Sequence, residues 1–508
     1  MTSKYYQPHN LNEIIIGGSG AGKSFRKIKP DIMQMFGSYV VTDPSGEIYR
    51  DTAKFLKKHG YKIKVLNLSD VNYGNSYNPF KYIHDEQGIL SLADLFMKNT
   101  SEEGEKEDFW VGAARNLLTV CMLYLCKSNE TASFGKIMRM ISTIRFNNQG
   151  RVDPFCDFAR QINYHMTVYP NDALSVKWGA ISSYPQETMG SVISMLSTRL
   201  GLWAVSSVDS LTDEDEMEFE SIGKEKTIIY VIIPPARQTY RAVANIFFTQ
   251  LFEVLINTAI LDYKGKLPLL VSCEIDEFAN IGQIPNFQET LAVVRKHNVR
   301  ICIALQGLSQ LKALYKDKWE SVIGNCSIFT YLGTNDLDTK EYIVKRLGKT
   351  TVRVDTKSSN TTGGGTDSEN FTGRELLTVD ELAKVIYMTN QDSGGNCIVF
   401  IDEFDPFYLK KFDTLHHKYF GELEKSSVEA DYSIVSQKRM EAYKYKRQKE
   451  EADKKNFFKK LDEEQQAKII AEEQRRIEEN KQQMSDFFDD DDFDDDDDDY
   501  PVFDDENT

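Results

Sequence analysis

The residues from Gly17 to Ser24 constrain this chain more than any other segment. They spell the phosphate-binding pattern G-x-x-x-x-G-K-S, as Gly17, Gly18, Ser19, Gly20, Ala21, Gly22, Lys23 and Ser24. Glycines let the chain turn tightly and aim backbone N–H groups at an anion. An isoleucine run at 14–16 predicts a strand before the loop, and a helix is expected from about residue 23. The positive end of that helix would lie at the phosphates. The segment therefore predicts a nucleotide site to which all eight residues contribute.

A second acidic motif supplies the other half of such a site. The expected strand 267–275 ends in Asp276 and Glu277. In nucleoside-triphosphatases Lys23 would bind the β- and γ-phosphates, Ser24 would ligate Mg²⁺, and Asp276 would hold that ion through water. Glu277 would be the base that orients the attacking water. The alternative is a solvated acidic turn, which the presence of the phosphate loop makes less favourable. ATP and Mg²⁺ are the predicted ligands.

Three further residues are candidates with open alternatives. Gln306 ends the expected strand 300–305, where a glutamine can sense the γ-phosphate or orient water, or can simply lie on the surface. Arg295 follows Glu277 in an expected helix. In ring ATPases an arginine of one subunit reaches the neighbour's phosphate, but a surface helix arginine fits equally well. Asp43 ends an earlier strand and either joins the same sheet edge or acts as a turn acid before proline.

Strand and helix patterns alternate along much of the chain, which indicates an α/β fold with a mainly parallel sheet. Helices are expected at 51–60 and 240–262, and a flexible glycine-rich loop at 361–370. The expected strands are 38–42, 62–66, 227–233, 267–275, 299–305, 327–332 and 396–401.

The pattern predicts five segments. Residues 1–83 and 216–425 are expected to be two parts of one nucleotide-binding domain, interrupted by an all-α insertion at 84–215 with helical spacing near 108–126 and 173–203. A charged helical extension at 426–484 and a disordered acidic tail at 485–508 follow.

Charge is distributed unevenly. The net charge is −17, but the last 24 residues contain fourteen Asp and Glu and no Lys or Arg, so the body is close to neutral. This tail cannot fold alone because it lacks a core and repels itself. It mimics nucleic acid, docks on a basic partner, or is a solubilising tail. The basic stretch 438–460, with interleaved aromatic residues, either touches DNA or is a solvated helix, and the second reading is favoured.

Other sequence features limit the class of protein. Seven scattered cysteines without a C-x-x-C pair argue against a zinc site or a disulfide framework and favour a reducing, cytoplasmic compartment. No run of eighteen apolar residues occurs, and the first residues lack the apolar core of a signal peptide, so no transmembrane helix is expected.

A series of motifs, in order, resembles a known family, the type IV coupling proteins of bacterial conjugation and secretion, which are TraG/TraD-like ATPases related to FtsK. The resemblance covers about residues 12–405. Its motifs are the phosphate loop with Lys29-Pro30, the block 40–47, Tyr77-Asn78-Pro79-Phe80, Asp108-Phe109-Trp110, the blocks 275–282 with Ile284-Pro285 and 305–311, Leu332-Gly333-Thr334-Asn335-Asp336, and Gly373-Arg374.

The resemblance implies a RecA-like motor domain, with a membrane-distal all-α domain, in a homohexameric ring that uses ATP to move DNA with its attached relaxase into a secretion channel. It carries the family's roles onto Lys23, Ser24, Asp276 and Glu277, matches Gln306 to a third motif, and places Arg295 at the inter-subunit arginine. The implied partners are single-stranded DNA with relaxase, the relaxosome and secretion-channel proteins. A separate membrane-anchor protein is also implied, which would recruit this otherwise cytoplasmic chain to the inner face of the cell membrane.

The chain departs from the family pattern in two places. Ser45 stands where the family usually has lysine, which puts that contact in doubt. The family usually begins with two transmembrane helices, whereas the phosphate loop here starts at residue 17, so either a separate membrane anchor or a shortened protein is expected. The alternatives are a DNA pump of the FtsK or packaging type, and a nucleotide-gated substrate receptor and assembly factor with little hydrolysis. The Gln306 block disfavours the first, and the intact Asp276–Glu277 pair disfavours the second.

Overall fold

The computed structural model describes residues 10–101, 105–128, 131–235, 238–359, 365–387, 394–423 and 428–488. The chain divides into two compact units, Met1–Lys438 and Arg439–Thr508. The first unit contains the sheet and nearly all helices, and the second contains most of one long helix, α17 (Val428–Phe488).

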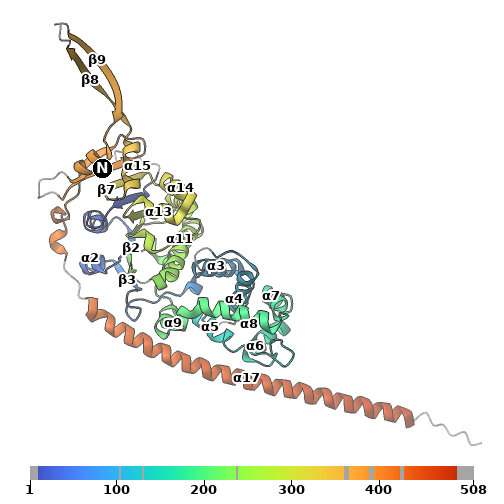
Figure 1. The fold of residues 1–508 in the computed structure, drawn as a ribbon. Coiled ribbons are helices and arrows are strands. Elements are labelled where there is room, and N and C mark those ends of the chain that lie inside the picture. Colours follow the sequence, from blue (N-terminus) through green and yellow to red (C-terminus); the bar gives the residue numbers. More distant parts are fainter. Residues whose placement is uncertain are drawn as a thin grey trace, which may run out of the picture. The chain divides into compact units, whose positions relative to one another are not determined.

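A nine-stranded sheet forms the centre of the first unit, in the order β11-β10-β7-β1-β6-β5-β2-β4-β3. Its strands β2, β3 and β7 are labelled in Figure 1. Strands β1 to β7 run parallel to their neighbours, while β10 and β11 are antiparallel additions at one edge. The strands are β1 (Glu13–Gly17), β2 (Ser38–Thr42), β3 (Lys62–Asn67), β4 (Thr227–Ile232), β5 (Val271–Ile275), β6 (Val299–Leu305), β7 (Ile328–Gly333), β10 (Asn396–Ile401) and β11 (Phe407–Lys410). The expected α/β fold with a mainly parallel sheet is confirmed.

Both faces of the central strands are covered, which explains their continuous apolar sequences. Along β1, Ile14 and Ile16 join the core on one face, and Ile15 joins the core on the other. Helices α1 (Lys29–Met33) and α2 (Glu47–Lys58) cover the second face. Helix α11 (Arg241–Tyr263) covers the first. The helices that follow it are α12 (Phe287–Val294), α13 (Leu308–Tyr315), α14 (Trp319–Gly324), α15 (Leu337–Leu347) and α16 (Val379–Tyr387).

Between β3 and β4 the chain forms a group of helices. Helix α4 packs against α3, α7 and α8. The helices of this group are α3 (Glu86–Asn99), α4 (Phe109–Lys127), α5 (Phe134–Ile141), α6 (Asp157–Val168), α7 (Ala173–Ser182), α8 (Gln186–Leu200), α9 (Ser206–Thr212) and α10 (Phe219–Ile222).

Two helices in the described residues are long and apolar enough to cross a membrane by length and composition, α4 and α11, although no membrane helix was expected. A bent pair, Gln186–Ala204 with Ser206–Thr212, would count as a third if it were one span. In α4 and α11 the shares of the apolar window buried inside the protein are 61% and 72%. Both helices contribute residues to the large core cluster, so packing within this chain accounts for their apolar composition.

The structure corrects several sequence-based expectations. The expected loop 361–370 is largely strand, because β8 (Lys349–Ser359) and β9 (Gly365–Glu375) pair antiparallel through eleven residues each, while 360–364 lie outside the described residues. Strand β5 begins at Val271 rather than at 267, since Pro268 cannot donate to a ladder.

The predicted boundary between the helical extension and the acidic tail differs from the observed end of the helix. Helix α17 continues to Phe488, so residues 485–488 are helical where a disordered tail was expected. The remainder of the acidic tail, 489–508, lies outside the described residues.

Candidate nucleotide-binding site

The phosphate loop follows β1 and has the backbone that its glycines permit. Gly20 and Gly22 have φ angles of 75° and 93°, a region that side chains disfavour. Ala21 N donates to Gly18 O at 3.1 Å, which closes the turn, and Gly18 N donates to Gly333 O at 2.9 Å, which ties the loop to β7. The loop is therefore fixed against the sheet at the carboxyl end of its strand.

The helix expected from about residue 23 begins as a wider turn. Residues Ser24–Ile28 form a π-helical turn, and α1 follows directly. Lys29 N donates to Ser24 O, five residues back, instead of to Phe25 O as in an α-helix. π-Turns inside helices are frequent at functional sites.

The two halves of the predicted site meet. Ser24 Oγ donates a hydrogen bond to Asp276 Oδ2, although the two residues are 252 positions apart. Thr42 Oγ1 donates to Asp276 O at 2.6 Å and holds the end of β5 against β2. Burial raises the pKa of Asp276, while the Ser24 hydroxyl and the Lys23 ammonium oppose this rise.

Glu277 stands beside the phosphate-loop lysine. Lys23 Nζ lies 3.3 Å from Glu277 Oε1 and donates to Gly17 O at 2.8 Å. Glu277 has φ and ψ of 50°, a left-handed conformation that is uncommon for a residue with a side chain. Such backbone conformations persist where the surrounding structure enforces them, and they cluster at functional sites.

Gln306 reaches this pair because of the strand order. β6 lies between β1 and β5, so the residue after β6 emerges between Lys23 and Glu277. Gln306 Nε2 lies 3.2 and 3.0 Å from the two carboxylate oxygens of Glu277. The backbone of Gln306 is held on both sides, by Thr334 Oγ1 donating to its carbonyl at 2.7 Å and by Gln310 Oε1 accepting from its N–H at 2.9 Å.

Ser24, Asp276, Glu277 and Gln306 line one cavity of about 330 Å³. The arrangement fits a magnesium-bound nucleotide, because the adjacent Ser24 hydroxyl and Asp276 carboxylate are oxygen donors of the kind that Mg²⁺ prefers. The lining residues are Ser24, Asp43, Pro44, Ser45, Glu47, Ile48, Pro235, Asp276, Glu277, Asn280, Gln306 and Gln310.

Asp43 lies at the same sheet edge as the other site residues and is also a turn acid, the two roles that the sequence left open. It lines the cavity, and it also acts as a turn acid, because its Oδ2 accepts a hydrogen bond from Tyr49 N in the first turn of α2 at 2.8 Å. Burial raises its pKa, and the backbone N–H groups of the turn oppose this. The segment 43–48 thus forms one wall of the cavity. Ser45 is part of that wall.

Arg295 does not join the site of its own chain. It is exposed just after α12 and precedes the amino end of β6, whereas Gln306 follows the carboxyl end of that strand. Seven strand residues span about 20 Å. An inter-subunit role for Arg295 stays a prediction.

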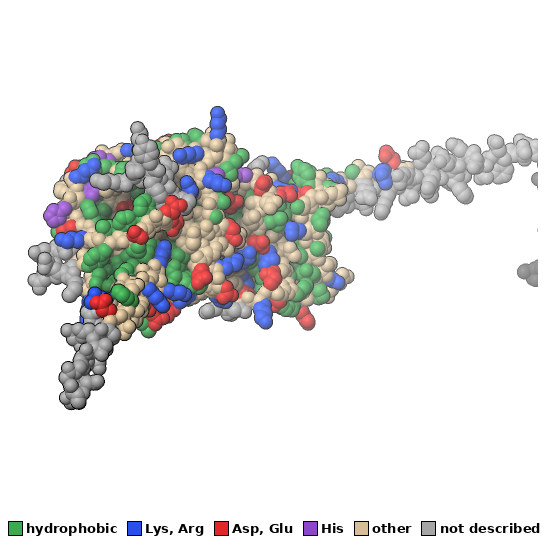
Figure 2. All heavy atoms as spheres, turned by 90° about the horizontal axis from the view of Figure 1, so that it is seen from above, with side chains coloured by type: hydrophobic (Ala, Val, Ile, Leu, Met, Phe, Trp, Pro, Cys, Tyr) green, Lys and Arg blue, Asp and Glu red, His purple; other side chains and the backbone are tan. Residues whose placement is uncertain are grey.

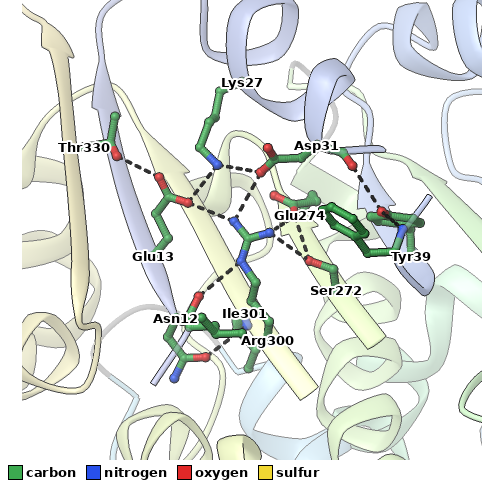
Figure 3. Close-up of polar contacts among 12 residues, drawn as sticks. Asn12, Glu13, Lys27, Asp31, Tyr39, Ser272, Glu274, Arg300, Ile301 and Thr330 are labelled. Atoms are coloured by element: carbon green, nitrogen blue, oxygen red, sulfur yellow. Dashed lines mark hydrogen bonds and ion pairs between the residues drawn. The ribbon is translucent and has the colours of Figure 1, made fainter. Parts of the chain in front are cut away.

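Figure 3 shows an ionic cluster in which Arg300 and Lys27 face the carboxylates of Glu13, Asp31 and Glu274. Arg300 contacts Glu13 at 2.8 Å, Glu274 at 2.9 Å and Asp31 at 3.2 Å, and Lys27 contacts Glu13 at 2.8 Å and Asp31. Burial acts to raise the pKa of Glu13, but Lys27 and Arg300 override it and lower the pKa to about 2. Burial raises the pKa of Glu274. The cluster joins the helical turn after the loop to β1, β5 and β6.

Sequence reasoning missed one group of contacts. Lys411, Phe412 and Thr414, which follow β11, make hydrogen bonds to the phosphate loop and its helical turn. Their sequence carries no motif that signals this role.

Comparison with known proteins identifies the family. The family model described as type IV secretory system conjugative DNA transfer matches residues 6–442. Conjugal transfer protein TraG of Agrobacterium fabrum is 22% identical over 368 residues, covering 68% of this chain and 52% of that protein. TraG of Escherichia coli is 22% identical over 439 residues, covering 80% and 68%. Protein VirD4 of Rhizobium radiobacter is 21% identical over 360 residues, covering 68% and 49%. The chain thus spans about half the length of the first and last of these relatives.

Solved structures of the coupling protein TrwB have the same fold. The unbound monoclinic form has a TM-score of 0.56 and 17% sequence identity, covering 81% of this chain and 90% of that one. The form in complex with ADP and Mg²⁺ has a TM-score of 0.53 and 15% identity, covering 80% and 87%. The resemblance seen in the motifs is therefore confirmed, and the chain belongs to the type IV secretion family of conjugative DNA-transfer proteins.

Proposed function

We propose that this chain is an ATP-driven DNA-translocating coupling ATPase, which delivers relaxase-bound DNA to a type IV secretion channel in conjugation. One observation carries the ATPase part of the proposal. Ser24, Asp276, Glu277 and Gln306 line a single cavity and Lys23 forms an ion pair with Glu277, although these residues follow the ends of three different strands.

Each residue has a distinct task in this proposal. The N–H groups of the phosphate loop and Lys23 bind the phosphates, and Ser24 and Asp276 hold Mg²⁺, which stabilises charge on the phosphate oxygens. Glu277 accepts a proton from the attacking water. Gln306 holds the Glu277 carboxylate through both of its oxygens and so fixes its orientation. TrwB has been solved with ADP and Mg²⁺ and with a non-hydrolysable ATP analogue, which supports the same ligands here.

Family membership supports the DNA part of the proposal. In Figure 2 acidic and basic side chains are interspersed over the face in view, so DNA contacts on a broad basic surface are not expected on that face. Basic groups confined to the channel of a ring fit this distribution better. We infer a homohexamer that membrane-bound partners recruit to the inner face of the cell membrane.

ATP hydrolysis with and without DNA tests the proposal. The purified chain should release phosphate from ATP, and single-stranded DNA should increase the rate. Lys23→Ala should abolish both the basal ATP hydrolysis and the hydrolysis that DNA stimulates. A rate that DNA leaves unchanged would favour the nucleotide-gated receptor, and a rate unaffected by Lys23→Ala would contradict the assigned site.

A further inference from the structure

Three residues from the C-terminal part of the first unit make hydrogen bonds to the phosphate loop and to the helical turn after it. Lys411 Nζ donates to Ala21 O at 3.1 Å, Arg26 Nη1 donates to Phe412 O at 3.2 Å, and Thr414 Oγ1 donates to Phe25 O. The first pair is 390 positions apart. We call residues 411–414 the clasp.

Lys411 fixes the direction of a peptide in the loop. Because a trans peptide points its C=O and N–H in opposite directions, an Ala21 carbonyl that faces Lys411 turns the Gly22 N–H to the other side. Backbone N–H groups of this loop are the ones that cradle phosphates. Lys411 therefore lies on the side of the loop opposite to the Gly22 N–H, and it holds this peptide in the orientation that phosphate binding needs.

The charge of Lys411 supports the same role. Its side chain is only 7% exposed, and among the described residues no carboxylate pairs with it. Burial and the neighbouring Arg26 lower the pKa of Lys411. A buried cation without a carboxylate partner, lying behind a phosphate loop, is stabilised when an anion binds in front of that loop.

Thr414 sustains the wide turn that follows the loop. In an α-helix Phe25 O would accept from Lys29 N, but here Lys29 N bonds to Ser24 O. The Thr414 hydroxyl takes the place of the missing donor on Phe25 O. Thr414 is fully buried, so its hydroxyl is fixed at the Phe25 carbonyl, which would lose this partner without it. The turn begins at Ser24, so its shape sets where the Ser24 hydroxyl lies.

We propose that Lys411 and Thr414 are positioning residues of the nucleotide site, which preorganise the phosphate loop and Ser24 from a segment that closes the domain. This inference rests on the proposed nucleotide-binding function. Neither residue lines the cavity; Lys411 acts through the backbone of the loop and Thr414 through the backbone of the turn that follows it. Their removal should therefore weaken nucleotide binding more than the chemical step.

The test is the affinity of the full chain for the fluorescent probe N-methylanthraniloyl-ATP with Mg²⁺. Lys411→Met should raise the Kd about tenfold, with kcat changed less than KM. Lys411→Arg, which keeps a charged donor, should recover most of the affinity. Thr414→Val should also raise the Kd, and Thr414→Ser should not. Lys410→Met is the matched control, since Lys410 is the exposed neighbour, and should bind like wild type.

The outcomes separate this inference from the proposed function. Wild-type binding no tighter than that of Lys23→Ala would overturn both. If the wild type binds the probe tightly and Lys411→Met binds it equally tightly, the positioning role of the clasp is overturned and the proposed nucleotide site is not. A Kd that rises equally in Lys410→Met, or that follows a lowered thermal unfolding midpoint of the free protein in every variant, would also overturn it.

Discussion

Lys23 Nζ lies 3.3 Å from Glu277 Oε1, so the phosphate loop and the acidic end of β5 are joined by a direct ion pair. The same ammonium donates to Gly17 O, the last residue of β1. One side chain thus connects two strands that are not neighbours in the sheet. This geometry places the phosphate-binding and water-activating groups within reach of one nucleotide.

Glu277→Gln should separate binding from hydrolysis. The amide keeps the size of the side chain but cannot accept the proton of the attacking water, so kcat should fall by roughly 10²–10⁴-fold. ATP binding should persist, because the phosphate loop is unchanged. Phosphate release and equilibrium nucleotide binding measure the two effects. Hydrolysis at the wild-type rate would show that another group is the base.

Gln306→Ala should lower kcat with little effect on KM. The amide holds both oxygens of Glu277, at 3.2 and 3.0 Å, so its loss frees the carboxylate to rotate. We expect a reduction on the order of tenfold, equivalent to about 1.4 kcal/mol in the barrier. Gln310→Ala removes another side chain that lines the cavity and accepts from the Gln306 N–H, but it leaves the Gln306 amide in place, so it should have a smaller effect. A change in KM alone would assign Gln306 to substrate binding instead.

Glu13→Gln should reduce stability more at neutral pH than in acid. The pKa of Glu13 is lowered from 4.5 to about 2 in the folded protein, so its ionised form stabilises the fold above pH 4.5. That stabilisation is lost as the pH falls from 4.5 towards 2. Urea unfolding should show a deficit of about 3 kcal/mol at pH 7 that shrinks at pH 3.

Glu225→Gln is the control for this experiment. It breaks an exposed ion pair with Lys62, in which both side chains are 53% exposed. A surface pair of this kind contributes little, so the control should show no comparable pH dependence. A deficit for Glu13→Gln that is constant between pH 7 and pH 3 would contradict the assigned ionic role.

Arg295→Ala should act on a neighbouring subunit. Since Arg295 lies at the opposite end of β6 from its own site, loss of activity must come through another chain. In mixed assemblies a minority of Arg295→Ala subunits should lower ATP hydrolysis more than in proportion to their number. Lys296→Ala, its exposed neighbour, should lower it no more than proportionally. A proportional loss for both would reject an inter-subunit role.

The sequence placed the phosphate loop and the acidic pair at strand ends because its motifs carry local chemistry. A glycine loop after a β-branched strand and an acidic pair after another apolar strand each indicate the carboxyl end of a parallel strand. Once β1, β6 and β5 are neighbours in that order, Ser24, Asp276 and Gln306 must converge.

Other contacts depend on long-range packing and had no local signal. Lys411 and Thr414 lie in an ordinary-looking segment, and only the fold brings them to the loop. The β8–β9 hairpin was missed because its sequence is mostly polar and gives no run of apolar residues from which a strand would be predicted. The five predicted segments of the chain stay predictions.

The most direct test of the account is the affinity of the chain for the Mn²⁺–ATP complex, measured by electron paramagnetic resonance in wild type, Lys23→Ala and Asp276→Asn. If one metal-bound triphosphate occupies both halves of the site, each variant should bind the same complex at least about tenfold more weakly than wild type. Wild-type affinity in Asp276→Asn, beside weakened binding in Lys23→Ala, would show that the acidic pair does not serve the nucleotide bound by the phosphate loop, and would contradict the account.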